Sequence, residues 1–382
     1  MNNIKLNKLL NEKYMLLKGI AKKFNYSDEL LVMITLTYVA FYMSLGKDCD
    51  VPLYDLFNNA QIIYEEGNVN EIAIRHDLGP MPQGSVAVTA FIPNLKLFKD
   101  ATQKQYPQAI ILGTHVGDNL ATPALKLEML IHEVRHALMG YYNSHLLIDE
   151  NTYYMRSGLH ETYYFRDDNA KEKFSSKSNG TTLDEITNTY ITELLVNKIM
   201  SFKENLIKNN KIRLYIDTLK TAQADKRYRA IGYNTEVRLL YPLLLNEEFI
   251  NLVNKCQFYG NINLIKEFLE NNIDSYAYDE FCQMLDEIFE LEGKCAKNNN
   301  PKDTEEFVRL IKTVKGIIIE MNKKLLGSSR NLLKDWANLS ISLEYTRNIY
   351  FYMNGSWTEY FETLIGAVLR QVSWFIIIMM IC

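Results

Sequence analysis

The segment from Thr122 to Tyr142 constrains the fold most, because its apolar residues recur at intervals of three and four. This spacing is typical of an amphipathic helix that packs one face on a core. Two histidines, His132 and His136, stand four residues apart in this segment, and Glu133 follows the first. Residues four apart lie on one helical face, with their Cβ atoms about 5–6 Å apart. We therefore predict a helix on which two imidazoles can coordinate a single metal ion.

The pattern His132-Glu133-Val134-Arg135-His136 predicts a zinc site. Neutral imidazole suits zinc, and a glutamate beside the first ligand can reach a water bound to the metal. The alternative is a pair of histidines with ordinary polar partners on a partly buried helix. The intact Glu133 favours a catalytic site, since a purely structural zinc site has no need of a carboxylate at this position.

A catalytic zinc site needs a third protein ligand and an open fourth position. We favour Glu185, which lies in a second predicted helix that begins near Thr182. The pair Thr182 and Glu185 also fits a capping box, in which the glutamate would only reach back to the helix backbone. Glu193, His160 and His145 are the other candidates.

The HExxH motif, followed by a helix with an Asp-Glu pair, resembles the gluzincin zinc metallopeptidases, whose best-known members are thermolysin-like. It is also similar to a set of uncharacterised bacterial metallopeptidase-domain proteins. The resemblance covers about Gly84–Met200. It implies that His132, His136 and Glu185 hold one Zn²⁺ and that Glu133 is the catalytic base.

One departure concerns the orientation of the ligating histidines. The thermolysin-like pattern has an acidic residue where this chain has Thr189. Ligating histidines usually need a hydrogen-bonding partner that fixes the ring. That partner must therefore come from another residue, and Asp184, Asn188 and Glu193 are the candidates.

The region before the HExxH helix combines a buried helix with short strands. The apolar run Leu30–Leu45 is too short to cross a bilayer and predicts a fully buried helix. Three short segments, set off by Gly, Pro or Asn, predict a small antiparallel sheet packed on the HExxH helix: Glu71–Asp77, Ser85–Ile92 and Ala109–His115. The resemblance implies that one of the last two pairs with an extended peptide.

The rest of the chain completes an α+β architecture. Two aromatic runs in Thr152–Arg166 flank Ser157-Gly158 and predict a hairpin, which the polar stretch Asp167–Gly180 links to the second helix. From Lys211 onward nearly every segment has a helical pattern. We predict a zincin-like catalytic region over residues 1–200 and a mainly helical C-terminal lobe over residues 201–382.

The composition indicates which classes of binding partner and which cellular compartment to expect. The chain of 382 residues has 42 Lys and Arg against 46 Asp and Glu, a formal charge of −4, so no overall field recruits nucleic acid. Its 5 cysteines are scattered and form no CxxC pair, which suits a reducing compartment. The N-terminus lacks the pattern of a secretory signal, and a cytoplasmic location is expected.

These features predict a zinc-dependent metallopeptidase that acts on a peptide or protein. A zinc-activated water would attack the peptide bond, with Glu133 as general base. An oxyanion donor is expected, and the sequence selects none of the candidates Tyr153, Tyr154, Tyr163, Tyr164, Tyr233 and His160.

The alternative function is a non-catalytic zinc-binding or interaction protein. The apolar tail Val372–Cys382 bears on this alternative, because it is either a packed helix or a segment that contacts a membrane. The packed helix is favoured.

Overall fold

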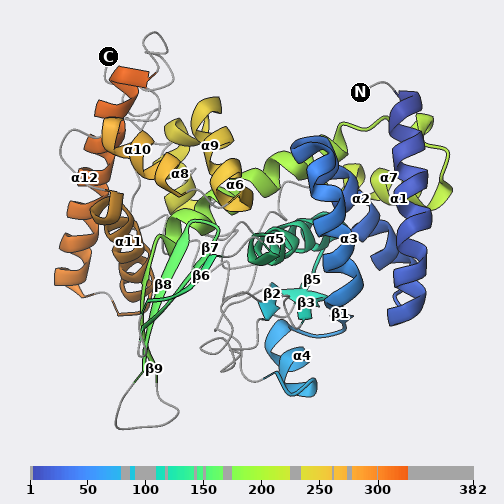
Figure 1. Ribbon diagram of the computed structural model, residues 1–382, viewed down its shortest axis with the longest axis horizontal. Coiled ribbons are helices and arrows are strands. Elements are labelled where there is room, and N and C mark those ends of the chain that lie inside the picture. Colours follow the sequence, from blue (N-terminus) through green and yellow to red (C-terminus); the bar gives the residue numbers. More distant parts are fainter. Residues whose placement is uncertain are drawn as a thin grey trace, which may run out of the picture.

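The computed structural model describes residues 3–78, 87–90, 109–116, 119–141, 144–148, 152–166, 174–223, 234–259, 262–272, 278–298 and 300–325. Within these residues the chain is mostly helical and carries small β-sheets, which is an α+β architecture (Figure 1). The predicted fold class is confirmed at this level. The tail Val372–Cys382 lies outside the described residues.

Four helices precede the HExxH helix: α1 (Asn3–Phe24), α2 (Asp28–Leu45), α3 (Asp50–Asn59) and α4 (Val69–Arg75). Helix α2 begins after Ser27, whose side chain accepts a hydrogen bond from the backbone N–H of Leu30. Every residue from Leu30 to Phe41 is buried, whereas residues 42–45 are partly or fully exposed, so the prediction of a fully buried helix over Leu30–Leu45 is confirmed only as far as Phe41. Among the described residues, the run 28–59 is long and apolar enough to span a membrane, and 67% of its most apolar window is buried inside the protein.

The first sheet is mixed, so the prediction of an antiparallel sheet is only partly confirmed. It contains β1 (Gln61–Glu65), β2 (Ala87–Ala90) and β3 (Ala109–Gly113), with β3 in the middle. Strand β1 pairs with β3 in parallel, and β2 pairs with β3 antiparallel. Both edges of β3 are occupied, so Ala109–His115 cannot be the segment that pairs with a peptide.

The segment Glu71–Asp77 is not a strand, because it forms most of helix α4. Asn68 caps this helix and makes a full capping box with Glu71, and this local hydrogen bonding begins the helix. Val69, Ile72 and Ala73 are buried. Their spacing of three and four residues places one side of a short helix against β3.

The second large sheet follows the HExxH helix α5 (Pro123–Tyr141). It is antiparallel and has the order β6 (Ser144–Leu147), β7 (Thr152–Ser157), β8 (His160–Arg166) and β9 (Phe174–Asn179). The predicted hairpin is confirmed as β7 and β8. The predicted linking stretch Asp167–Gly180 is partly wrong, because β9 lies within it and pairs with β8. A further short pair, β4 (His115–Val116) and β5 (Asn119–Leu120), precedes α5.

The remaining elements are helices, as the sequence predicted for the described part of this region. They are α6 (Thr181–Met200), α7 (Asn210–Gln223), α8 (Asn234–Leu244), α9 (Glu247–Tyr259), α10 (Asn263–Asn272), α11 (Tyr278–Asn298) and α12 (Pro301–Leu325).

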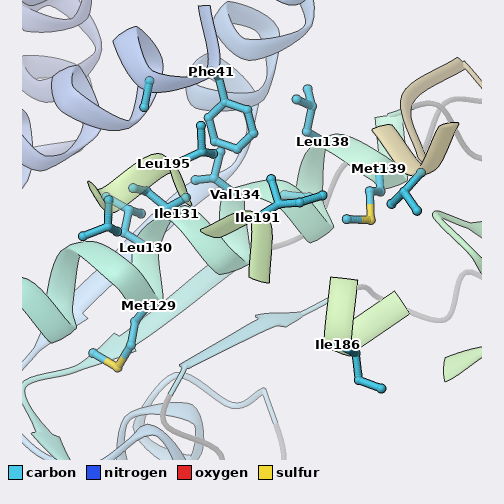
Figure 2. Close-up of a cluster of buried hydrophobic side chains, with 14 of the residues drawn as sticks. Phe41, Met129, Leu130, Ile131, Val134, Leu138, Met139, Ile186, Ile191 and Leu195 are labelled. Atoms are coloured by element: carbon cyan, nitrogen blue, oxygen red, sulfur yellow. The ribbon is translucent and has the colours of Figure 1, made fainter. Parts of the chain in front are cut away.

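One hydrophobic cluster joins helices from both ends of the described chain. Figure 2 shows its central part, where Phe41 of α2 and Leu195 of α6 pack around Val134 and Ile131 of α5. The same cluster extends from α1 to Met321 of α12. Helices on both sides of residue 200 therefore share a core, while the division into a catalytic region and a separate lobe stays a prediction.

Candidate metal centre

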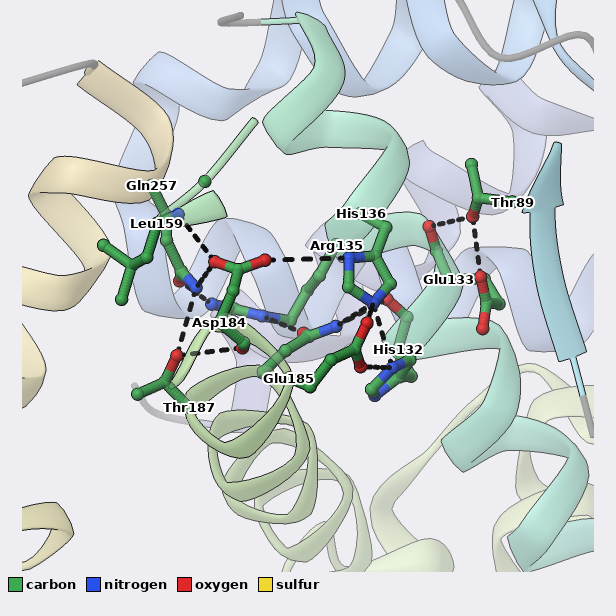
Figure 3. Close-up of polar contacts among 12 residues, drawn as sticks. Thr89, His132, Glu133, Arg135, His136, Leu159, Asp184, Glu185, Thr187 and Gln257 are labelled. Atoms are coloured by element: carbon green, nitrogen blue, oxygen red, sulfur yellow. Dashed lines mark hydrogen bonds and ion pairs between the residues drawn. The ribbon is translucent and has the colours of Figure 1, made fainter. Parts of the chain in front are cut away.

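Two helices bring three potential ligands together (Figure 3). His132 and His136 project from successive turns of α5, and Glu185 projects from the first turns of α6. The two imidazole Nε2 atoms are 3.0 Å apart. The Glu185 carboxylate places Oε2 3.2 Å from His132 Nε2 and Oε1 3.2 Å from His136 Nε2. Among the described residues, these three form the group of side chains that can hold a metal ion.

The three side chains lie close enough together to bind one metal ion. Zinc bonds of about 2.0–2.1 Å to nitrogen and oxygen place neighbouring donor atoms about 3.3 Å apart. The two imidazole nitrogens are 3.0 Å apart, and the Glu185 carboxylate offers each of them a different oxygen at 3.2 Å. Two imidazole nitrogens that face each other at this distance need a proton or a cation between them, because both lone pairs point inward. The donor set therefore fits Zn²⁺.

The start of α6 explains why Glu185 is available to the histidines. The helix begins after Gly180, which has a left-handed backbone (φ 77°) and provides no side-chain cap. The backbone N–H of Thr182 donates to Asp286 Oδ1 of α11 at 2.8 Å. The capping box between Thr182 and Glu185 is therefore absent, and the Glu185 carboxylate lies against both imidazoles instead.

Charge in this cluster is strongly coupled. Burial disfavours the charged form of His136, but Glu185, with smaller contributions from Glu133 and Asp184, more than offsets burial and raises the pKa of His136 to about 10. Burial likewise disfavours ionised Glu185, yet the imidazolium of His136 and the hydrogen bond with His132 hold the pKa of Glu185 well below its ordinary value. A proton and a metal ion thus compete for the same nitrogen of His136.

Glu133 lies beside the three ligands but faces the first sheet. Its side chain is 6% exposed. The hydroxyl of Thr89 on β2 lies 2.7 Å from Glu133 Oε2 and 2.9 Å from the backbone oxygen of the same residue. Strand β2 therefore holds the carboxylate that is predicted to be the general base, and no sequence pattern points to Thr89.

Asp184 is the acidic group next to His136. Its Oδ2 atom is 4.0 Å from His136 Nδ1, which is an electrostatic contact and longer than a hydrogen bond. Its Oδ1 atom accepts hydrogen bonds from the backbone N–H of Leu159 at 2.7 Å and from Gln257 Nε2 at 3.1 Å. Burial raises the pKa of Asp184, and the charge of His136 opposes that rise. Of the three predicted orienting residues, Asp184 thus faces the ring nitrogen that points away from the ligand cluster.

Asn188 is the second predicted orienting residue that lies at the site. Its Oδ1 accepts from Arg135 Nε at 2.7 Å, which fixes the direction of the amide. Its Nδ2 donates to the backbone oxygen of His132 at 3.3 Å and lies 3.0 Å from His136 Nε2. Asn188 therefore ties α6 to the turn of α5 that carries both histidines.

The other sequence candidates lie outside the group of three ligands. His160 begins β8, where its Nε2 is 2.9 Å from Thr162 Oγ1. The hydroxyl of Tyr154 donates to Glu161 at 2.7 Å and is thus engaged on the sheet. Glu193 lies two helical turns beyond Glu185 on α6. The side chains of His145 and Tyr153, and the whole of Tyr233, lie outside the described residues.

Comparisons of the chain with protein-family models, with curated proteins and with solved structures found no match. A functional interpretation therefore depends on the geometry of the site and on the chemistry of its side chains.

Proposed function

We propose that this protein is a zinc-dependent metallopeptidase. The observation that carries the proposal is the convergence of His132, His136 and Glu185 from two helices, with donor atoms 3.0–3.2 Å apart. Two imidazoles and one carboxylate are the ligand set of several zinc hydrolases, which keep the fourth position for water or substrate. When bound, the zinc would lower the pKa of a water molecule toward about 7 and polarise the substrate carbonyl.

Partial exposure of the ligands supports a catalytic role over a structural one. The side chains of His132, His136 and Glu185 are 20%, 19% and 21% exposed. A structural zinc site is closed by four protein ligands, whereas a catalytic site keeps one position open. Solvent reaches all three ligands here, and three protein ligands leave a position for the reacting groups.

Glu133 would be the general base. It is adjacent to the first ligand, on the same turn of α5, and Thr89 orients its carboxylate. In this role it accepts the proton of the attacking water and later delivers it to the leaving amine. The oxyanion donor is left unassigned among the tyrosines and His160.

We propose that the substrate is an extended peptide that lies along β2. In the described part of the chain, β2 pairs with β3 on one side. Its residue Thr89 contacts Glu133, so a peptide on the other side of β2 would run beside the general base. A cytoplasmic location and a partner set without nucleic acid complete the proposal, on the charge and cysteine pattern given above.

The first experiment tests metal and catalysis together. Purified protein should contain one zinc per chain by elemental analysis and should cleave members of a peptide library. Glu133→Gln should keep the zinc and lose cleavage, whereas Glu305→Gln, at an exposed position on α12, should keep both. Equal cleavage by wild type and Glu133→Gln would contradict the proposed mechanism.

The second experiment tests the third ligand. Glu185→Ala should lose zinc because only the two histidines remain, while Glu193→Ala, on the same helix, should retain it. Zinc content and melting temperature are measured on both variants. Full zinc in Glu185→Ala, with only a lower melting temperature, would show that this carboxylate is structural.

A further inference from the structure

Gln257 of α9, a helix beyond residue 200, contacts residues that lie next to the proposed metal ligands. It is fully buried. Its Oε1 accepts a hydrogen bond from the Arg135 guanidinium at 2.5 Å, and its Nε2 donates to Asp184 Oδ1 at 3.1 Å and to Thr187 Oγ1 at 3.3 Å. Arginine can only donate and a carboxylate can only accept, so the amide has one satisfactory orientation. Gln257 thus connects α5 to α6 through hydrogen bonds.

The hydrogen bonds end at Asp184, which makes an electrostatic contact with the ring of His136. Asp184 directs one oxygen to Gln257 and to Leu159, and the other oxygen faces His136 Nδ1 at 4.0 Å. A carboxylate on this side of the ring favours a proton on Nδ1. The lone pair of Nε2 then points toward His132 and Glu185, which is the tautomer that a metal requires.

Arg135 closes the network from the other side. Its guanidinium is 1% exposed, lies over the ring of Phe258 of α9, and donates to both Gln257 and Asn188. Arg135 occupies the position directly before His136 on α5. Each of the three helices around the centre is therefore joined to the other two by buried side-chain hydrogen bonds.

We infer that Gln257 is a positioning residue of the proposed zinc centre, which holds Asp184 in place and through it sets the orientation of His136. This inference rests on the proposed zinc site and adds to it a residue of α9. The catalytic region predicted over residues 1–200 does not contain Gln257, so the site is incomplete without the later helices.

The test is the zinc affinity of the full chain, measured by competition with a chromophoric chelator. Gln257→Met has a similar volume and removes both sets of hydrogen bonds. We expect it to weaken zinc binding about 10–100-fold, which is the usual effect of losing an outer partner of a metal ligand. Asp184→Asn should weaken binding similarly. Combining the two should add little to either alone, since both changes break one chain of contacts.

Val253→Ala is the matched control, because Val253 is also fully buried on α9 and belongs to the hydrophobic core. It should lower the melting temperature and leave the zinc affinity unchanged. An affinity of Gln257→Met within twofold of wild type, or an equal loss in Val253→Ala, would overturn the inference. If Gln257→Met does not fold, the zinc affinity of Asp184→Asn is the test. An affinity equal to that of wild type would overturn the inference, because Gln257 is proposed to act through Asp184.

The two proposals fail differently. If wild type binds no zinc, or binds it equally after His132→Ala, the proposed metal centre is wrong. If wild type binds zinc through His132 and the Gln257 variant binds it equally well, only the positioning role is wrong.

Discussion

Three buried glutamates and the half-buried Glu185 show that the partner, more than burial itself, decides what a carboxylate does in this protein. Glu185 is held ionised by two imidazoles, and Glu161 accepts from the Tyr154 hydroxyl while pairing with Lys266 at 3.1 Å. Glu133 receives the hydroxyl of Thr89. Glu236 of α8 is different, because burial and the nearby carboxyl of Glu292 both raise its pKa well above the ordinary value.

Glu236 should make stability depend on pH. A carboxyl with a raised pKa keeps a proton in the folded state that the unfolded chain releases, so stability falls as the pH rises from the ordinary glutamate range through the raised value. Glu236→Gln removes this loss. We expect the variant to resist urea better than wild type at pH 8 and to show no such advantage at pH 4. Urea midpoints at the two pH values measure this, and an equal shift at both would contradict the explanation.

Thr89 should matter to catalysis more than to metal binding. A hydrogen bond to a charged group contributes about 1.5–3 kcal/mol, so Thr89→Val should lower kcat/KM at least about tenfold through a misplaced Glu133 carboxylate. Zinc content should be unchanged, because Thr89 contacts none of the three ligands. Thr89→Ser retains the hydroxyl and should keep most of the activity. Peptide hydrolysis and zinc content of both variants decide the point.

The proposed ligands could be predicted from the sequence, and so could Asp184 and Asn188 as their neighbours, whereas Thr89 and Gln257 could not. His132, Glu133 and His136 lie within five residues, so the helical repeat alone puts the two histidines together. Glu185 was favoured by its place at the start of a helix. Gln257 stands in an ordinary helical pattern 121 residues after His136, and only the packing of α9 on α5 and α6 gives it a role.

At the level of elements, helices and the hairpin could be predicted from local sequence patterns, whereas the pairing of strands distant in sequence could not. The helices α2 and α5 and the hairpin of β7 and β8 are defined by periodicity and by a glycine turn. Strand β1 pairs with β3 in parallel across more than 40 residues, and no local pattern encodes that register. The error at α4 arose because a seven-residue helix with four apolar residues also satisfies a short strand pattern.

The turn of the hairpin lies against Asp184, next to the candidate metal centre. Gly158 has a left-handed backbone (φ 64°), and a Cβ atom there would meet Asp184 Oδ1 and lie 2.6 Å from Met139 Sδ. Gly158→Ala should cost about 1–3 kcal/mol from the backbone alone, and the steric contacts add to this. Because the contacts displace Asp184, we also expect weaker zinc binding.

Gly19→Ala is the control for this substitution. Gly19 lies in the interior of α1, with nothing within 4 Å of the added Cβ. The variant should be about 1 kcal/mol more stable than wild type, because alanine favours the helix, and its zinc affinity should not change. Thermal unfolding and chelator competition on both variants test the pair. A Gly158→Ala protein as stable as wild type would show that the turn tolerates a side chain.

For the whole molecule, the important feature is that the candidate site combines elements that lie far apart in the sequence, from β2 to α9. The proposed general base contacts β2, the proposed ligands lie on α5 and α6, and hydrogen bonds connect these two helices to α9. All three helices contribute to the same hydrophobic cluster. Zinc binding should therefore be linked to the stability of elements that lie far apart in the sequence.

Hydrogen exchange with and without zinc tests this linkage. Zinc at 100 times its Kd should stabilise the folded protein by about 2.7 kcal/mol, because it binds the folded state. The added protection should appear in α5, α6 and α9, since buried hydrogen bonds join them, and should be weakest in α4, which packs in a separate small cluster with β1 and β3. His132→Ala should abolish the effect everywhere. If zinc increases protection only in α5 and α6, then zinc binding does not stabilise α9. The hydrogen bonds of Gln257 would then not couple α9 to the metal site.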